Sequence, residues 1–82
     1  MTNDLREEVL SVLAERFGVD RVTVTDESRL REELDLDSID LFDVLGLVEK
    51  KTGAELALAD FANVETLGDF LARLEMIVSK AA

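Results

Sequence analysis

The sequence predicts an all-α domain: a small bundle of three longer helices and one or two short helices, with a long loop between the first and second long helices. Apolar residues recur at helical spacing in three stretches, and two of these stretches come after a capping residue with an acid three positions later. The 82 residues suit one domain over residues 1–82 with one core. Because aromatic residues make up only 5% of the chain, we expect that core to be mainly Leu and Val.

The first helix is expected over about residues 4–17, because its apolar residues fall on one helical face. The residues on this face are Leu5, Val9, Leu10, Val12, Leu13 and Phe17. Gly18 comes directly after them, and glycine is the residue that most readily ends a helix.

Residues 18–37 form a long connection that leads to Ser38. Residues 22–25, with the sequence VTVT, have strand-like composition, but a single strand without a partner is not stable, so we interpret them as extended loop. Residues 28–34 are predicted to form a short helical turn, with Leu30 and Leu34 facing the core. Loops of this length are often functional, which draws attention to the serine at its end.

The second helix is expected over residues 38–52, ending near Gly53. Asp37 is the predicted N-cap, and Asp40 completes a capping box in which Asp takes the usual place of Glu. Its apolar residues extend beyond one stripe, so some of them are expected to be exposed or to line a pocket. We expect the core-facing stripe to contain Phe42, Leu45 and Val48.

The last helix is predicted to begin at a second capping box, made by Thr66 and Asp69, and a short turn over residues 59–62 is expected before it. Its apolar spacing includes Leu67, Phe70, Leu71, Leu74, Ile77 and Val78. The core candidates of the whole chain are Leu10, Leu13, Leu30, Phe42, Leu45, Val48, Phe61, Phe70 and Leu71. The sequence leaves open whether some of them line a cavity instead.

Composition excludes several kinds of function. The chain has no Cys and no His, so it has neither a disulfide nor the commonest general base and metal ligand, and we expect no metal site. The formal net charge of −10 disfavours nucleic acid and anionic membrane surfaces and favours a protein partner with a basic patch. The first residues lack the apolar segment of a signal peptide, and no apolar run is long enough to span a bilayer, so we expect a cytoplasmic location. We also expect a monomer.

Ser38 is the most informative residue, because it lies where a polar loop becomes an amphipathic helix. At that position the hydroxyl is at the positive end of the helix, where a phosphate group is favoured. Without His or Cys, the chain has no ordinary means of activating this serine as a nucleophile. We therefore expect no catalytic residues and interpret the protein as a carrier modified by another enzyme. A purely structural capping role for Ser38 is the alternative interpretation.

The segment LDLDSID at residues 34–40 resembles the acyl carrier protein family, which has Asp-Ser-Leu at the start of its second helix. Ile39 is a mild variant of that Leu, and the similarity extends over essentially the whole chain, including residues 53–56 and 64–69, as well as its size and acidity. The resemblance implies that Ser38 carries 4′-phosphopantetheine, transferred from coenzyme A by a phosphopantetheinyl transferase. The arm would then hold acyl groups as thioesters.

The resemblance also implies partners and a docking surface. The expected partners are acyltransferase and ketosynthase-type enzymes of fatty-acid or polyketide-type biosynthesis, which would bring basic patches to Asp37, Ile39, Asp40 and Asp43. A solvated acidic face that complements the helix start is the alternative for these carboxylates. A peptidyl or D-alanyl carrier, or an unmodified acidic helical interaction module, is the alternative function.

The chain departs from common family patterns in ways that affect the pathway. It has no proline after the second helix and no Gly-Gly before the motif, and it has Lys50 and Lys51 where fatty-acid carriers often have acids. The sequence does not indicate which acyl group is carried.

Overall fold

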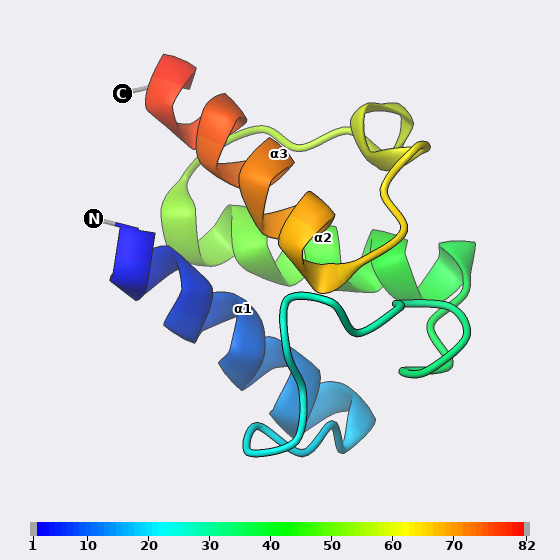
Figure 1. Ribbon diagram of the computed structural model, residues 1–82. Coiled ribbons are helices and arrows are strands. Elements are labelled where there is room, and N and C mark those ends of the chain that lie inside the picture. The colour runs from blue at the N-terminus through cyan, green and yellow to red at the C-terminus, as the bar shows by residue number, and fades with distance from the viewer. Residues whose placement is uncertain (1, 82) are drawn as a thin grey trace.

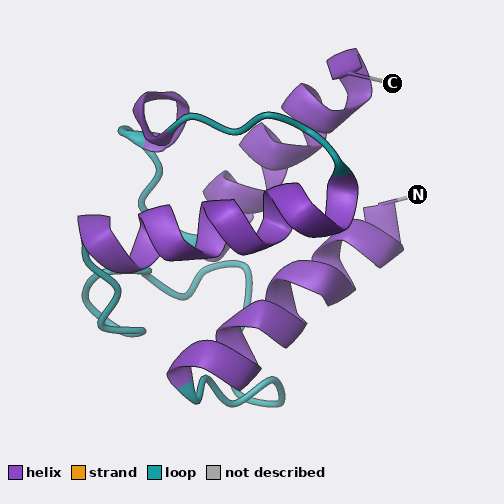
Figure 2. Ribbon diagram, turned by 180° about the vertical axis from the view of Figure 1, so that it is seen from behind, coloured by secondary structure: helices purple, strands orange, loops and turns teal. Residues whose placement is uncertain are grey.

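The computed structural model describes residues 2–81, and it has the expected all-α architecture. The elements are α1 (Thr2–Phe17), α2 (Ser38–Thr52), the 3-10 helix η1 (Leu58–Phe61) and α3 (Leu67–Ala81). Figure 1 shows α2 crossing behind α1 and α3, and the start of α1 and the end of α3 lie on the same side of the molecule. Figure 2 shows the same bundle from behind, with α2 in front.

α1 begins two residues before the expected start and ends where the sequence indicates. Gly18 has a φ of 70°, in the left-handed region that glycine adopts without strain. Its N–H donates to the carbonyl of Ala14 at 3.1 Å, and the N–H of Val19 donates to the carbonyl of Leu13 at 3.2 Å. The Gly18 bond is that of the αL C-cap motif, and the two bonds together satisfy carbonyls at the end of the helix.

α2 has the predicted bounds and the predicted caps. Asp37 is the N-cap with a φ of −97°, and its side chain and that of Asp40 form both bonds of a capping box. At the other end, Gly53 has a φ of 78°, and its N–H donates to the carbonyl of Glu49 at 2.7 Å. The positions of both helix ends therefore follow from local sequence.

The core lies between the three helices and is made mainly of Leu and Val, as predicted. Its buried residues are Val9, Leu10, Val12, Leu13, Val24, Leu30, Leu36, Val44, Leu45, Val48, Ala54, Leu56, Phe61, Leu67, Phe70 and Leu74. η1 begins one residue before the predicted turn and packs on α3, where the ring centroids of Phe61 and Phe70 are 4.9 Å apart. Leu71 is only partly buried and packs at the edge of this core.

The expectation that Phe42 belongs to the core is wrong, because its side chain is 67% exposed. α2 buries Val44, Leu45 and Val48 instead. At about 100° per residue, Phe42 lies roughly 110° around the helix from the centre of this buried face. The buried face of α2 is therefore rotated away from the predicted stripe, and Phe42 joins Ile39 on the surface.

The loop between α1 and α2 is ordered by contacts with the segment before α3. The N–H of Leu30 donates to the carbonyl of Glu65, and the N–H of Leu67 donates to the carbonyl of Ser28, both at 2.9 Å. An isolated bridge pairs Arg29 with Thr66, and no strand occurs within residues 2–81, as expected. Residues 22–25 are not extended throughout, however, because residues 21–23 form a turn in which the N–H of Val24 donates to the carbonyl of Asp20 at 3.1 Å. The bonds between the loop and the segment before α3 fix one side of the entrance to α2.

The helical turn predicted over residues 28–34 forms as a single turn over residues 30–33. The N–H of Glu33 donates to the carbonyl of Arg29 at 2.9 Å, and Leu30 is buried, whereas Leu34 is partly buried. The chain then reverses at Asp35, whose φ of 58° is unusual for a residue other than glycine. This reversal brings Leu36 back into the core immediately before α2 begins.

Candidate functional site around Ser38

Ser38 is the first residue of α2, and its side chain is exposed. Asp37 Oδ1 accepts a hydrogen bond from the N–H of Asp40 at 2.9 Å, and Asp40 Oδ2 accepts one from the N–H of Asp37 at 3.3 Å. The helix start is thus capped by these two carboxylates. Within residues 2–81, the Ser38 hydroxyl forms no hydrogen bond, so it is available for chemistry. Ser38 itself does not cap α2, because Asp37 is the N-cap.

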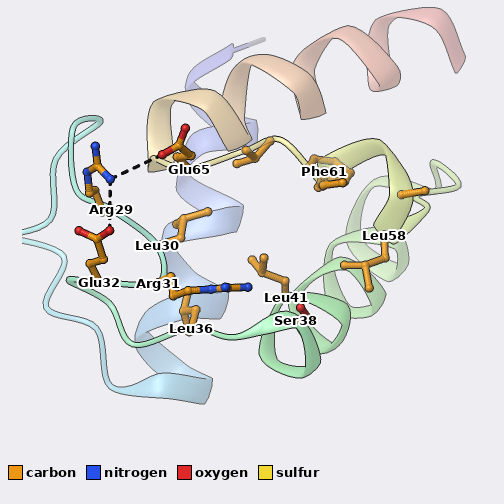
Figure 3. A pocket seen from close by; sticks show the side chains of 13 residues that line it. Arg29, Leu30, Arg31, Glu32, Leu36, Ser38, Leu41, Leu58, Phe61 and Glu65 are labelled. Atoms are coloured by element: carbon orange, nitrogen blue, oxygen red, sulfur yellow. Dashed lines mark hydrogen bonds and ion pairs between the residues drawn. The ribbon is translucent and has the colours of Figure 1, made fainter.

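Ser38 lies on a groove of about 730 Å³. Figure 3 shows that the loop before α2, the first turn of α2 and the η1 region surround this groove. Its apolar lining comprises Leu30, Leu36, Leu41, Leu58, Ala59, Phe61, Ala62 and Val64, and its charged lining comprises Arg29, Arg31, Glu32 and Glu65. The sequence left open whether core candidates line a cavity, and Leu30 and Phe61 do so.

Two arginines of the loop line the same groove with different surroundings. Arg29 lies between two carboxylates, with its guanidinium 3.3 Å from Glu32 Oε1 and 3.5 Å from Glu65 Oε1. Arg31 extends across the groove toward the end where Leu41 and Ser38 lie (Figure 3). The positive charge closest to this end of the groove therefore comes from the loop, not from α2.

The four predicted docking residues fall into different environments. Asp37 and Asp40 make the capping box, and Ile39 is 78% exposed beside them. Asp43 instead faces α1, where its Oδ2 accepts bonds from Arg16 Nε at 3.0 Å and from another guanidinium nitrogen at 2.8 Å. Asp43 is thus held by a cation of the same chain, whereas the other three lie around Ser38.

Sequence reasoning missed two features of this region. Phe42 adds a large exposed apolar side chain close to Ile39 on α2, and the signal was the excess of apolar residues on that helix. Arg31 faces the groove of Ser38, but it is seven positions earlier in a loop whose path depends on long-range hydrogen bonds. No local pattern places it there.

Two further observations concern the described residues. In that part of the chain, no group of three or more His, Cys, Asp or Glu side chains is arranged to hold a metal ion. None of its helices combines the length and the apolar character needed to cross a membrane.

Comparison with known proteins agrees with this geometry. The family described as "Phosphopantetheine attachment site" matches residues 7–74. Acyl carrier protein 2 of Ralstonia nicotianae is 34% identical over 76 residues, which cover 93% of this chain and 94% of the relative. The acyl carrier protein of Thermotoga maritima is 36% identical over 67 residues, covering 82% and 83% of the two chains. The acyl carrier protein of Saccharopolyspora erythraea is 32% identical over 78 residues, covering 87% and 82%.

These matches extend over most of the chain and include the helix that Ser38 begins. The prosthetic group of this family is 4′-phosphopantetheine, and its members carry intermediates without catalysing their conversion. The chain belongs to the phosphopantetheine-binding carrier family and is an acyl-carrier-like protein.

Proposed function

We propose that residues 1–82 form a single acyl carrier domain and that Ser38 is its attachment site for 4′-phosphopantetheine. The observation that carries this proposal is the exposed Ser38 hydroxyl at the start of α2, left without a hydrogen bond within residues 2–81 because Asp37 and Asp40 cap the helix. The groove beside it fits a long, flexible substituent, since its lining combines apolar side chains with charged ones.

Loading is a substitution at phosphorus. Ser38 Oγ forms a bond to the pantetheine-side phosphorus of coenzyme A, the pyrophosphate bond breaks, and adenosine 3′,5′-bisphosphate leaves. The proton of the hydroxyl passes to a base of the transferase, because this chain has no His and, in the described part of the chain, no carboxylate bonded to Ser38. The arm then supplies a thiol that holds the acyl group as a thioester. The carrier contributes the attachment point and the surface that partners bind.

The relatives are named acyl carrier proteins, which supports an acyl cargo and a role in fatty-acid or polyketide-type biosynthesis. A peptidyl or D-alanyl carrier is loaded differently, since an adenylating enzyme charges its arm. Two reactions of the loaded protein distinguish these carriers. One contains malonyl-coenzyme A and an acyltransferase, and the other contains an amino acid, ATP and an adenylating enzyme. Acylation only in the second reaction would contradict the proposed cargo.

The attachment site is tested by intact mass before and after incubation with coenzyme A, Mg²⁺ and a broad-specificity phosphopantetheinyl transferase. The unmodified protein is expected to gain one phosphopantetheinyl group, and Ser38→Ala to gain none. Ser79→Ala is the matched control, because Ser79 is also an exposed helical serine but lies in α3. Full loading of Ser38→Ala, or no loading of the folded parent chain, would reject the assignment.

We also propose that Asp37, Ile39 and Asp40 form the centre of the docking surface, with Phe42 beside them. The carboxylates attract basic patches on the transferase and on acyltransferase or ketosynthase-type partners, and the exposed apolar side chains add contact area. Asp43 contributes less, because Arg16 already neutralises its charge. Such transient, electrostatically steered contacts suit a shuttle that must release each partner.

Docking is tested by the rate of transfer from coenzyme A at low carrier concentration. Phe42→Ala is expected to lower kcat/KM about tenfold, as for loss of one exposed aromatic contact of moderate strength. Met76→Ala, which removes an exposed apolar side chain of α3, is the control. If the two variants were loaded at equal rates, Phe42 would not be part of the docking surface.

A further inference from the structure

We propose that Arg31 is a positioning residue for the phosphodiester on Ser38 and directs the arm along the groove. This inference rests on the proposed attachment site at Ser38. Arg31 and Ser38 line the same groove, and the Arg31 side chain extends across it toward the end where Ser38 lies (Figure 3). A phosphodiester carries one negative charge, and a guanidinium can donate two parallel hydrogen bonds to phosphate oxygens.

The charge distribution singles out Arg31 among the arginines of the first half of the chain. Arg6, Arg16, Arg21 and Arg29 each form an ion pair with a carboxylate. Within the described residues, Arg31 forms none. Both acids that line the groove, Glu32 and Glu65, face Arg29 instead. The groove therefore contains one cation whose charge is not balanced by a carboxylate of the described chain.

The attachment site needs such a cation, because its immediate neighbours are acidic. Asp37 precedes Ser38 and Asp40 lies two residues after it, and the chain as a whole has a formal net charge of −10. A phosphodiester placed among these carboxylates is repelled by them. Arg31 approaches from the loop before α2 and offsets part of that repulsion.

The loop holds Arg31 in place for this role. Leu30, directly before it, is buried and its N–H donates to the carbonyl of Glu65. The carbonyl of Leu30 in turn accepts the N–H of Leu36 at 2.9 Å, which closes the loop around residues 31–35. Arg31 therefore projects from a fixed backbone, while its own side chain is exposed and adaptable. Contact with the phosphate would bias the first bonds of the arm toward the groove rather than into solvent.

The test compares the parent chain, Arg31→Gln and Arg73→Gln after enzymatic loading, with intact mass establishing that each carries one phosphopantetheinyl group. Arg73→Gln is the matched control, because it removes one exposed arginine of α3 that does not line the groove. The readouts are the ³¹P chemical shift of the phosphodiester and the ¹⁵N relaxation of the arm's amides after loading with labelled coenzyme A. Neither readout depends on the activity of a partner enzyme.

Arg31→Gln is expected to shift the ³¹P signal toward that of the same phosphodiester in the urea-unfolded loaded protein and to increase the mobility of the arm, whereas Arg73→Gln leaves both unchanged. Raising the salt concentration from about 0.05 to 0.5 M should move the parent signal in the same direction and leave Arg31→Gln nearly unaffected, because exposed charges are screened. Identical spectra for loaded parent and Arg31→Gln would overturn the role of Arg31 while leaving Ser38 as the attachment site. Failure of the parent chain to load would overturn both.

Discussion

The starts of α2 and α3 have the same kind of cap but differ in how far they are buried. Each begins with a capping box, made by Asp37 and Asp40 in one helix and by Thr66 and Asp69 in the other. The first residues after the two caps differ in burial: Leu67 is fully buried, whereas Ser38 is exposed. One helix start is therefore built into the core and the other presents a hydroxyl to a partner.

Backbone contacts show the same division. At the start of α3, the N–H groups of Leu67 and Gly68 donate to the carbonyls of Ser28 and Asp26, at 2.9 and 2.7 Å. These bonds attach the loop before α2 to the entrance of α3. At the start of α2, the cap is made within four residues, and the side chains of Ser38 and Ile39 point outward. The fold is thus secured at α3, which leaves the surface around Ser38 free for recognition.

The largest predicted contrast is between Leu67→Ala and Ser38→Ala. Loss of the buried Leu67 side chain should lower the free energy of unfolding by about 2–5 kcal/mol, through lost burial and a cavity. Ser38→Ala should change it by no more than about 0.5 kcal/mol, because Ser38 is exposed and does not make the cap. Urea denaturation monitored by circular dichroism measures both. A large loss of stability in Ser38→Ala would show that this serine has a structural role.

Two glycines offer a smaller and oppositely signed contrast. A Cβ at Gly46, in the middle of α2, would meet no atom within 4 Å beyond the neighbouring backbone of its own helix, so Gly46→Ala should stabilise the protein by about 1 kcal/mol through helix propensity. A Cβ at Gly68 would lie 3.0 Å from the carbonyl oxygen of Asp26, which is the acceptor of the Gly68 N–H. Gly68→Ala should therefore destabilise by about 1 kcal/mol, as overpacking does.

The same urea titrations measure both glycine variants. Stabilisation by Gly68→Ala comparable with that by Gly46→Ala would mean that the loop moves freely at the entrance to α3. The close approach would then not constrain the backbone. A lower stability of Gly46→Ala than of the parent chain would point to a contact on α2 that the structure does not have.

The starts of α2 and α3 were predictable from sequence because a cap is a local pattern. Asp37 and Asp40, like Thr66 and Asp69, are three positions apart, and both boxes form as expected. Gly18 and Gly53 likewise mark helix ends through their own backbone conformation. The family was also predictable, because the resemblance rests on short contiguous segments, residues 34–40, 53–56 and 64–69, together with the size and acidity of the chain.

Two features could not be predicted, because they depend on which neighbours each side chain meets. Phe42 belongs to the apolar pattern of α2, but the direction from which α1 and η1 pack on that helix leaves it exposed. Arg31 reaches the groove only because Leu30 bonds to Glu65, a partner 35 positions later. Sequence spacing does not specify from which side the neighbouring elements pack or which distant residue a loop bonds to. The residues of the docking surface and of the groove could therefore be identified only from the fold.

The smallest predicted effect concerns pH and the cap of α3. Hydrogen bonds from the backbone N–H groups of Thr66 and Glu65, with a further bond from the Thr66 side chain, lower the pKa of Asp69 below its ordinary value of 3.8. The folded protein thus binds this proton less readily than the unfolded chain. Ionised Asp69 therefore contributes stability above the unfolded pKa, and this contribution is lost as the pH falls through the folded pKa.

Asp69→Asn should consequently reduce the loss of thermal stability between about pH 5 and pH 2. Near neutral pH the variant should melt slightly below the parent chain, and the two melting temperatures should converge as the pH falls. Glu75→Gln is the control, since it removes one exposed negative charge from α3 outside the capping box. If the melting temperatures of Asp69→Asn and the parent chain instead stay parallel over the whole range, the α3 cap holds without its charge. The difference between the two helix starts would then rest on the backbone bonds to the loop and on the residue after the cap, buried Leu67 in one and exposed Ser38 in the other.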